Sequence, residues 1–393
     1  MPWDQRSTMD QKRLFIADYL TRSFTIVDLC DRFGISRPTA YKWIQRFLSR
    51  GYQGLDELPR RPSRCPHRTA DELVEVLLEL RRRHPSWGPK KLLRILTKRR
   101  PDEAWPARST VAQILKRHGF VETKRRRAFP GHPGKPMTAM NRPNDVWCAD
   151  YKGEFKTRDG IYCYPLTVTD GCSRFLLECK ALLSTEHVLA KPVFSKLFRR
   201  FGLPKIIRTD NGTPFASTAI GRLSRLSIWW IRLGIFPELI EPGRPQQNGR
   251  HERMHKTLKR ETTRPPAASL QGQQFRFNRF REEFNTERPH EALDQETPSS
   301  IYTSSNRHYP ERLPKVEYPA HFETRLVSRN GGFRWKSERV PLTQTLEEEY
   351  VGLEEVDDGK WDVYFGFVRL GQMDERTFTI KDALGNRMRQ RAL

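Results

Sequence analysis

Several features typical of membrane, secreted or zinc-finger proteins are missing from this chain. No apolar run approaches the roughly 20 residues that a bilayer-spanning helix needs, and the N-terminus lacks a signal-peptide apolar region. The six cysteines include no Cys-x-x-Cys pair, so we expect reduced thiols packed as small apolar side chains. No glycine-rich phosphate loop is present, which argues against a nucleotide cofactor. We therefore expect a soluble, cytoplasmic protein with no membrane partner.

Acidic residues are scarce relative to basic ones. Lys and Arg number 71 against 47 Asp and Glu, which gives a formal net charge of +24 and a pI of about 10.1. Such an excess indicates a polyanionic partner, most simply nucleic acid, although a ribosomal or membrane-surface protein could share it. The 393 residues are enough for several domains, and 11% aromatic residues can fill their cores.

Residues 1–58 show the pattern of a helix-turn-helix DNA-binding domain. Apolar residues predict a helix over Leu14 to Leu20 and a second over Ile26 to Phe33, which Gly34 ends in a turn. Ser36 then caps a third helix. The outward residues of this third helix, which would enter the major groove, are Arg37, Thr39, Tyr41 and Lys42. A plain three-helix bundle is the alternative.

Residues 66–128 repeat the helical theme and predict a second helix-turn-helix DNA-binding domain. Thr69 caps one helix, Trp87 lies at the start of another, and Ser109 caps a third. The residues of the third helix that are available for DNA are Arg108, Gln113 and Lys116. Proline-rich stretches at 58–64 and 130–136 predict linkers, and a basic run at 124–127 precedes the second one.

The remainder of the chain divides into a mixed region and a strand-rich tail. Residues 140–302 alternate strand and helix signals, which predicts a mixed five-stranded α/β sheet with helices on both sides. Residues 315–393 carry hairpin signals at Asn330-Gly331 and Asp358-Gly359, followed by strand-like alternation from Trp361. We expect a small C-terminal β-barrel that contacts DNA, with a purely structural cap as the alternative.

Three acidic residues lie at the ends of predicted strands or at the start of a predicted helix. Asp150 closes a short apolar run that predicts a buried strand, Asp210 follows a second strand, and Glu252 opens a predicted helix. Folding could bring the three together, and three convergent carboxylates suit a pair of hard divalent cations. In so basic a chain the natural substrate for such a pair is a phosphodiester.

At these residues the sequence resembles the catalytic core shared by retroviral integrases and bacterial insertion-sequence transposases. The matching motifs are Trp147-x-x-Asp150, Thr209-Asp210-Asn211-Gly212, Asn248-Gly249-x-x-Glu252-Arg253, and Phe284-Asn285-x-x-Arg288-Pro289-His290-x-x-Leu293 followed by Thr297-Pro298. The resemblance covers about 140–302 and implies a ribonuclease-H-like fold there. The whole chain would then be a multidomain α+β protein with N-terminal helix-turn-helix domains and a C-terminal small β-barrel.

The spacing of the third acidic residue departs from the usual pattern of that family. The spacing that many members share would place the third carboxylate at Gln246, which cannot replace it. Glu238 and Glu241 are therefore rivals, but Glu252 is preferred because Asn248-Gly249 precedes it and a helix follows it.

The resemblance implies a set of roles for these residues. Asp150, Asp210 and Glu252 would be the catalytic metal ligands, with Asp150 bridging two Mg²⁺ ions that Mn²⁺ can replace. Lys256 and Lys259 share the helical face of Glu252 and would contact DNA phosphates. The alternative to a DNA contact is an ordinary ion pair between Glu252 and Lys256.

The function that follows is a DDE-type DNA transposase. Such an enzyme binds the terminal inverted repeats of a mobile element, cuts the 3′ ends and joins them to target DNA. We expect double-stranded DNA as partner, a homodimer or higher synaptic complex, and a nucleoid-associated location in a bacterial cytoplasm. The alternatives are a catalytically inactive helix-turn-helix regulator and a metal-dependent nuclease without strand transfer.

Overall fold

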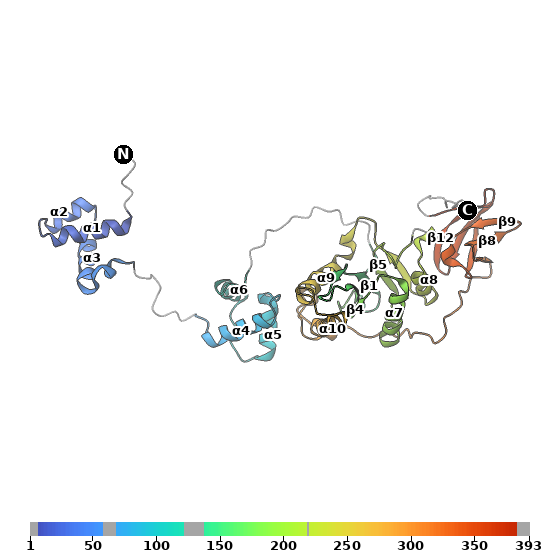
Figure 1. Ribbon diagram of the computed structural model, residues 1–393, viewed down its shortest axis with the longest axis horizontal. Helices are drawn as coiled ribbons and strands as arrows, with labels where there is room; N and C mark the ends of the chain where they lie inside the picture. The colour runs from blue at the N-terminus through green and yellow to red at the C-terminus, as the bar shows by residue number, and fades with distance from the viewer. Residues whose placement is uncertain (1–6, 58–67, 122–136, 218–219, 383–393) are drawn as a thin grey trace. The chain divides into compact units, whose positions relative to one another are not determined.

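The computed structural model describes residues 7–57, 68–121, 137–217 and 220–382. The chain divides into two compact units, Met1–Thr69 and Ala70–Leu393 (Figure 1). Both predicted linkers, at 58–64 and 130–136, lie outside the described residues.

Three helices form the first unit: α1 (Thr8–Leu20), α2 (Ile26–Phe33) and α3 (Arg37–Arg50). The bounds predicted for α2 are confirmed, because Thr25 and Asp28 form a capping box at its start and Gly34 ends it in the left-handed conformation. Ser36 occupies the N-cap position of α3, but its hydroxyl bonds to the Thr39 hydroxyl at 2.9 Å and not to a backbone N–H. The buried side chains of the unit include Phe15, Ile16, Leu29, Ala40, Trp43 and Ile44.

A second group of helices opens the second unit: α4 (Asp71–Arg83), α5 (Pro89–Arg99) and α6 (Arg108–Arg117). The caps expected at Thr69 and Ser109 are wrong, since α4 begins after Ala70 and α6 after Ala107, neither with a side-chain cap. In place of a side-chain cap, the negative charges of Asp71 and Glu72 in the first turn of α4 interact favourably with the positive end of the helix dipole. Ser109 already lies inside the first turn of α6.

A mixed sheet forms the centre of the second unit. Its strands are β1 (Val146–Tyr151), β2 (Phe155–Lys156), β3 (Tyr162–Asp170), β4 (Leu176–Leu182), β5 (Ile206–Thr209) and β6 (Phe236–Leu239). The order is β2-β3-β1-β5-β6, with β4 also paired to β3. The first strand pairs antiparallel with β3 and parallel with β5, so it is central. The five strands expected are thus joined by one short extra strand, β2, which pairs with the start of β3.

Helices cover both faces of this sheet, as the sequence predicted. They are α7 (His187–Phe201), α8 (Arg225–Arg232), α9 (Gly249–Thr262), α10 (Leu270–Thr286) and the short α11 (Pro298–Ile301). Side chains of α7 and α8 share a core with Trp147, Ala149 and Val168 of the sheet. Side chains of α9 and α10 form a separate core with Cys163 and Cys179 on the other face (Figure 1).

The tail folds into β-structure around its own core. Its strands are β7 (Glu323–Leu326), β8 (Gly332–Trp335), β9 (Glu338–Pro341), β10 (Tyr350–Asp357), β11 (Lys360–Phe365), β12 (Val368–Asp374) and β13 (Thr379–Lys381). They form a five-stranded sheet, β13-β12-β11-β10-β7, and a separate β8-β9 hairpin. The closed barrel that we expected is not found among the described residues. The reason is that β8 leaves the sheet at the Asn330-Gly331 turn and pairs with β9, so β7 and β13 remain sheet edges.

Two further expectations can be compared with the described residues. No helix in these parts of the chain is long and apolar enough to cross a membrane. The cysteines described there are free thiols, and all except the partly exposed Cys172 are buried. Burial raises the pKa of Cys148 to about 11 and of Cys163 to about 12, as expected for thiols packed among apolar side chains.

Candidate active site

The three acidic residues singled out in the sequence come from three different elements. Asp150 lies near the end of β1, Asp210 directly follows β5, and Glu252 lies in the first turn of α9. Because β1 and β5 are parallel neighbours, their carboxyl ends lie at the same edge of the sheet. The fold thereby brings two strand-end carboxylates to one place.

The pKa of Asp150 reflects the negative charges of Asp210 and Glu252. Its side chain is 19% exposed. Burial, followed by the negative charges of Asp210 and Glu252, raises the pKa of Asp150 to about 7. Both other carboxylates therefore act on Asp150, although they are 60 or more residues away in the sequence. A strongly shifted pKa of this kind is typical of a functional site.

The turn after β5 fixes the direction of Asp210. The backbone N–H of Gly212 donates to Oδ1 of Asp210 at 3.1 Å, and the Asn211 side-chain amide donates to the carbonyl of Ile240 at 2.9 Å. A side chain at position 212 would place its Cβ 3.2 Å from Oδ2 of Asp210. The Asn-Gly pair therefore lets the turn close around the carboxylate without crowding it.

Glu252 shares the exposed side of α9 with two lysines. Lys256 and Lys259 are both exposed, and their spacing places them on the helical face of Glu252. Burial, followed by the positive charge of Lys259, lowers the pKa of Lys152, which follows Asp150 closely, so α9 and the end of β1 are electrostatic neighbours. Among the described residues no ion pair joins Glu252 to Lys256, so the structure does not support the alternative of an ordinary ion pair between them.

Of the two rivals for the third carboxylate, Glu238 is engaged elsewhere. Its Oε2 accepts from Nε of the buried Arg208 at 2.6 Å, and its Oε1 accepts from the backbone and hydroxyl of Thr138 at 3.0 and 2.7 Å. The backbone N–H of Glu241 donates to Gln247 at 2.8 Å. Glu238 thus serves as the counterion of Arg208 between two parallel strands.

A histidine and threonine network beneath Asp150 was largely missed by sequence reasoning. The Thr167 hydroxyl lies 2.7 Å from Nε2 of His251, 2.6 Å from Nε2 of His255, and 3.0 Å from the carbonyl of Asp150. The Thr169 hydroxyl lies 2.8 Å from Nδ1 of His251. His255 is buried, and its ring contacts the Thr167 hydroxyl. A signal existed, because His251 and His255 fall on the same helical stripe as the buried Leu258.

Together with Asp150, His251 and His255 are close enough to be considered as a set of metal ligands. Ligand atoms of Asp150, His251 and His255 all lie within 4.8 Å of one another. Both ring nitrogens of His251 and one of His255 already have threonine partners, however. Burial lowers the pKa of His251 to about 3 and lowers that of His255 further, so both rings are neutral. These contacts indicate a support for Asp150 and not a set of free nitrogen ligands.

The proposed DNA-contacting residues of the two helix-turn-helix regions lie on surfaces. On α3, Arg37, Tyr41 and Lys42 are exposed, while Thr39 is half-buried and bonded to Ser36. On α6, the exposed residues are Arg108, Gln113 and Lys116, opposite the buried Val111, Ile114 and Leu115. The division between outward and inward residues matches that of a recognition helix.

Comparison with known families agrees with this arrangement. Two models, each described as an integrase core domain, match residues 140–245 and 233–298. Residues 140–298, which include Asp150, Asp210 and Glu252, are thus similar to an integrase core domain. A helix-turn-helix domain model matches residues 12–63, and a homeodomain-like domain model matches residues 39–115. These two models overlap the helices that precede residue 140.

Two of the similar proteins are viral polyproteins. The Gag-Pol polyprotein of baboon endogenous virus (strain M7) is 36% identical over 132 residues, which are 34% of this chain and 7% of the relative. The Pol polyprotein of feline endogenous virus ECE1 is likewise 36% identical over 132 residues, 34% of this chain and 12% of the relative. The match thus spans a small part of either polyprotein.

Two solved structures can be compared with the fold. The HTLV-2 integrase catalytic core domain in complex with magnesium is 17% identical, covers 41% of this chain and 97% of that one, and gives a TM-score of 0.33. The simian T-cell lymphotropic virus intasome in complex with the PP2A regulatory subunit B56 gamma is 16% identical, covers 75% and 97% of the two chains, and gives 0.37.

Proposed function

We propose that this chain is a transposase of the DDE type. It binds the terminal inverted repeats of a mobile element, cuts the 3′ ends and transfers them into target DNA. The observation that supports the proposal is that Asp210, after β5, and Glu252, on α9, both act electrostatically on Asp150 of β1, in the region that matches the integrase core models. The net charge of +24 supports a polyanionic substrate.

The donor set fits hard divalent cations. Carboxylate oxygens are the ligands that Mg²⁺ prefers, and the chain offers three of them around one strand edge. Asp150, Asp210 and Glu252 would hold two Mg²⁺ ions, with Mn²⁺ as a substitute. When bound, such ions would activate the attacking oxygen and stabilise the leaving oxygen of a displacement at phosphorus.

The chain's own residues would then position the DNA. The hydroxyl of Thr167 and the neutral His255 hold the end of β1, so that Asp150 keeps its direction. Lys256 and Lys259 would hold backbone phosphates on the exposed face of α9, next to Glu252. Tight positioning of this kind is a large part of catalysis of phosphoryl transfer.

Two displacements at one site account for the reaction. In the first, a water oxygen attacks phosphorus at the element end, the bond to the 3′ oxygen breaks, and a 3′-hydroxyl and a 5′-phosphate result. In the second, that 3′-hydroxyl attacks a target phosphodiester, and the target's own 3′ oxygen leaves with a proton. The second step exchanges one phosphodiester for another, so it needs no ATP.

Paired element ends require more than one active site. Each chain contains one acidic triad, so we propose a homodimer or a larger synaptic complex on double-stranded DNA. The helix-turn-helix regions would read the end sequence, and the C-terminal β-structure would add DNA contacts. Such a protein would act at the nucleoid of a bacterial cell.

The test is an assay with labelled duplexes that carry the element ends, plasmid target and Mg²⁺. Asp150→Asn, Asp210→Asn and Glu252→Gln should each reduce cutting and joining by about 100-fold or more, because each removes transition-state stabilisation, while DNA binding is retained. Glu241→Gln is the matched control and should remain active. Cutting without joining would indicate a nuclease, and binding without cutting would indicate a regulator. An inactive Glu241→Gln beside an active Glu252→Gln would reassign the third ligand.

A further inference from the structure

A basic groove lies beside the active-site helix. It has a volume of about 1180 Å³ and is bounded by α4 to α6 on one side and by α9 and α10 on the other. The cationic residues that line it are Arg81, Arg83, Lys116, Arg260, Arg276 and Arg279. The acidic residues that line it are Glu261 and Glu283. Positive charge therefore dominates both walls.

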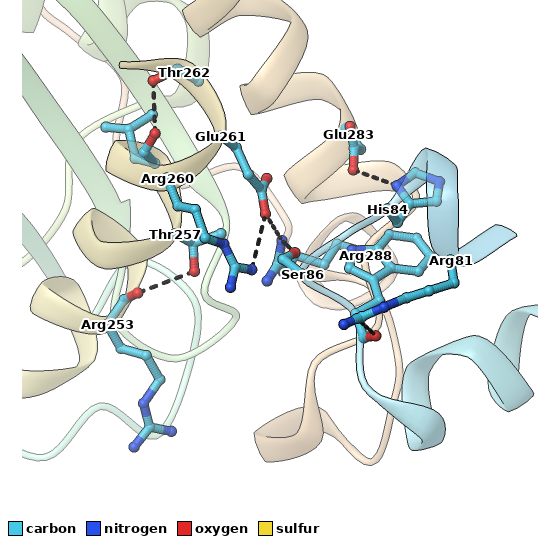
Figure 2. A network of polar contacts seen from close by, with 12 residues as sticks. Arg81, His84, Ser86, Arg253, Thr257, Arg260, Glu261, Thr262, Glu283 and Arg288 are labelled. Carbon is cyan, nitrogen blue, oxygen red and sulfur yellow. Dashed lines mark hydrogen bonds and ion pairs between the residues drawn. The ribbon is translucent and has the colours of Figure 1, made fainter. Parts of the chain in front are cut away.

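Polar contacts hold the two walls in place (Figure 2). Nδ1 of His84 lies 2.9 Å from Oε1 of Glu283 on α10, and the His84 ring stacks on Trp87 with 3.8 Å between centroids. Arg288 donates to Glu261 at 3.1 Å and to the Ser86 hydroxyl at 3.4 Å. Both groove carboxylates thus take part in the contacts that join the two walls, and six cationic residues against two acidic ones leave the lining with net positive charge.

Among the described residues, several cations that line the groove have no carboxylate partner within ion-pair distance, whereas Arg83 pairs with Glu79 at 2.5 Å. The guanidinium of Arg81 donates to the backbone carbonyls of Trp87 and Phe120, while its buried Nε has no hydrogen-bond partner. Burial and the positive charge of Arg260 lower the pKa of Arg81, so two like charges are close together. Arg260 itself lies 3.9 Å from Glu261, farther than Arg288 does. In the described parts of the chain, no carboxylate pairs with Arg81, Lys116 or Arg279.

The groove continues directly from the candidate active site. Glu252, Lys256 and Lys259 are followed on the same helical face by Arg260, which lines the groove. Eight residues of helix rise about 12 Å, which matches about three to four nucleotides of one DNA strand at 3.4 Å per phosphate. A row of cations at such intervals suits a phosphate backbone better than an acidic peptide.

We propose that this groove holds the sugar-phosphate backbone of the DNA duplex next to the strand end that is cut. The inference rests on the proposed function and names the path of its substrate. It also changes the role of the second helix-turn-helix region. Contacts of His84 and Ser86 fix α4 to α6 to the core, and Lys116 of α6 lines the groove. These helices therefore form one of the two walls that bind the DNA phosphates.

The test measures DNA affinity of the full chain by fluorescence anisotropy with a random-sequence duplex. An Arg260→Gln, Arg279→Gln double variant removes two exposed groove cations. It should lower the slope of log affinity against log salt by about two and weaken binding severalfold at about 200 mM salt. The matched control, Lys196→Gln with Arg200→Gln, removes two exposed cations from α7 on the other face of the sheet and should keep the slope.

Two further measurements make the result decisive. Arg260→Lys with Arg279→Lys keeps the charge and should restore the slope, which separates charge loss from misfolding. An unchanged slope in the double glutamine variant, or an equal decrease of the slope in the α7 control, would overturn the proposal that the groove binds DNA. The proposed function fails by a different result, namely Mg²⁺-dependent cutting that survives Asp150→Asn, whatever the groove variants do.

Discussion

His255 on α9 and Asp150 on β1 face each other, with 3.6 Å between Nδ1 of the ring and Oδ2 of the carboxylate. The ring is neutral because burial lowers its pKa. A neutral partner at this distance leaves the negative charge of Asp150 uncompensated. The ring therefore lies against the carboxylate without neutralising it, and the Thr167 hydroxyl bonds the backbone carbonyl of Asp150.

Thr167→Val should weaken this support. The hydroxyl of Thr167 serves two histidine rings and a backbone carbonyl, so its loss leaves several buried polar groups without partners. We expect a loss of about 1–3 kcal/mol in the free energy of unfolding, measured by urea denaturation. Thr169→Val removes only one contact with His251 and is the control. Equal stability of the two variants would contradict the role given to Thr167.

Asp150→Asn should stabilise the metal-free protein at pH 8. The folded pKa of Asp150 is about 7, against 3.8 as the ordinary value. The unfolded state therefore loses its proton first, and folding stability falls as pH rises from about 4 to about 7, by up to about 4 kcal/mol. Asparagine carries no charge, so this loss disappears.

Thermal unfolding at pH 4 and pH 8 measures the effect. The variant should match the parent near pH 4 and exceed it at pH 8. Added Mg²⁺ should raise the melting temperature of the parent more than that of the variant at pH 8. Asp102→Asn, at an exposed position, keeps Asp150 and should therefore match the parent at both pH values. A variant that is less stable than the parent at pH 8 would argue against strong repulsion at Asp150.

His84 and Glu283 should be energetically coupled. Their side chains are 11% and 30% exposed and make a direct contact between the turn after α4 and α10. His84→Gln, Glu283→Gln and the double variant form a cycle whose coupling we expect to be about 1 kcal/mol. Hydrogen exchange of the α5 amides reports it, because loss of the contact should increase opening of that region. Additive effects would mean that the contact contributes nothing to docking.

Removal of Met1–Thr69 should separate specific from general DNA binding. The deleted unit contains α3 with its exposed Arg37, Tyr41 and Lys42. Base contacts give specificity, whereas phosphate contacts are spread over the remaining basic surface. Competition gel shifts should show a loss of preference for element ends over random DNA, with salt-sensitive binding retained. Undiminished preference would place end reading elsewhere in the chain.

The sequence alone determined features that depend on a few neighbouring residues. The bounds of α2 followed from apolar spacing and from Gly34, because capping and helix termination are local. The positions of Asp150 and Asp210 at the ends of strands followed equally from short apolar runs. Local rules were weaker at α4 and α6, where Thr69 and Ser109 were good cap residues that the chain does not use.

Only the tertiary structure decided which distant residues meet. The contacts of Thr167 with His251 and His255, and of His84 with Glu283, join positions that are 84 to 199 residues apart. No local pattern encodes such pairs, since they arise when whole helices pack against a sheet. The same applies to the tail, where strand signals predicted the strands, but the pairing of β8 with β9 left the expected barrel open.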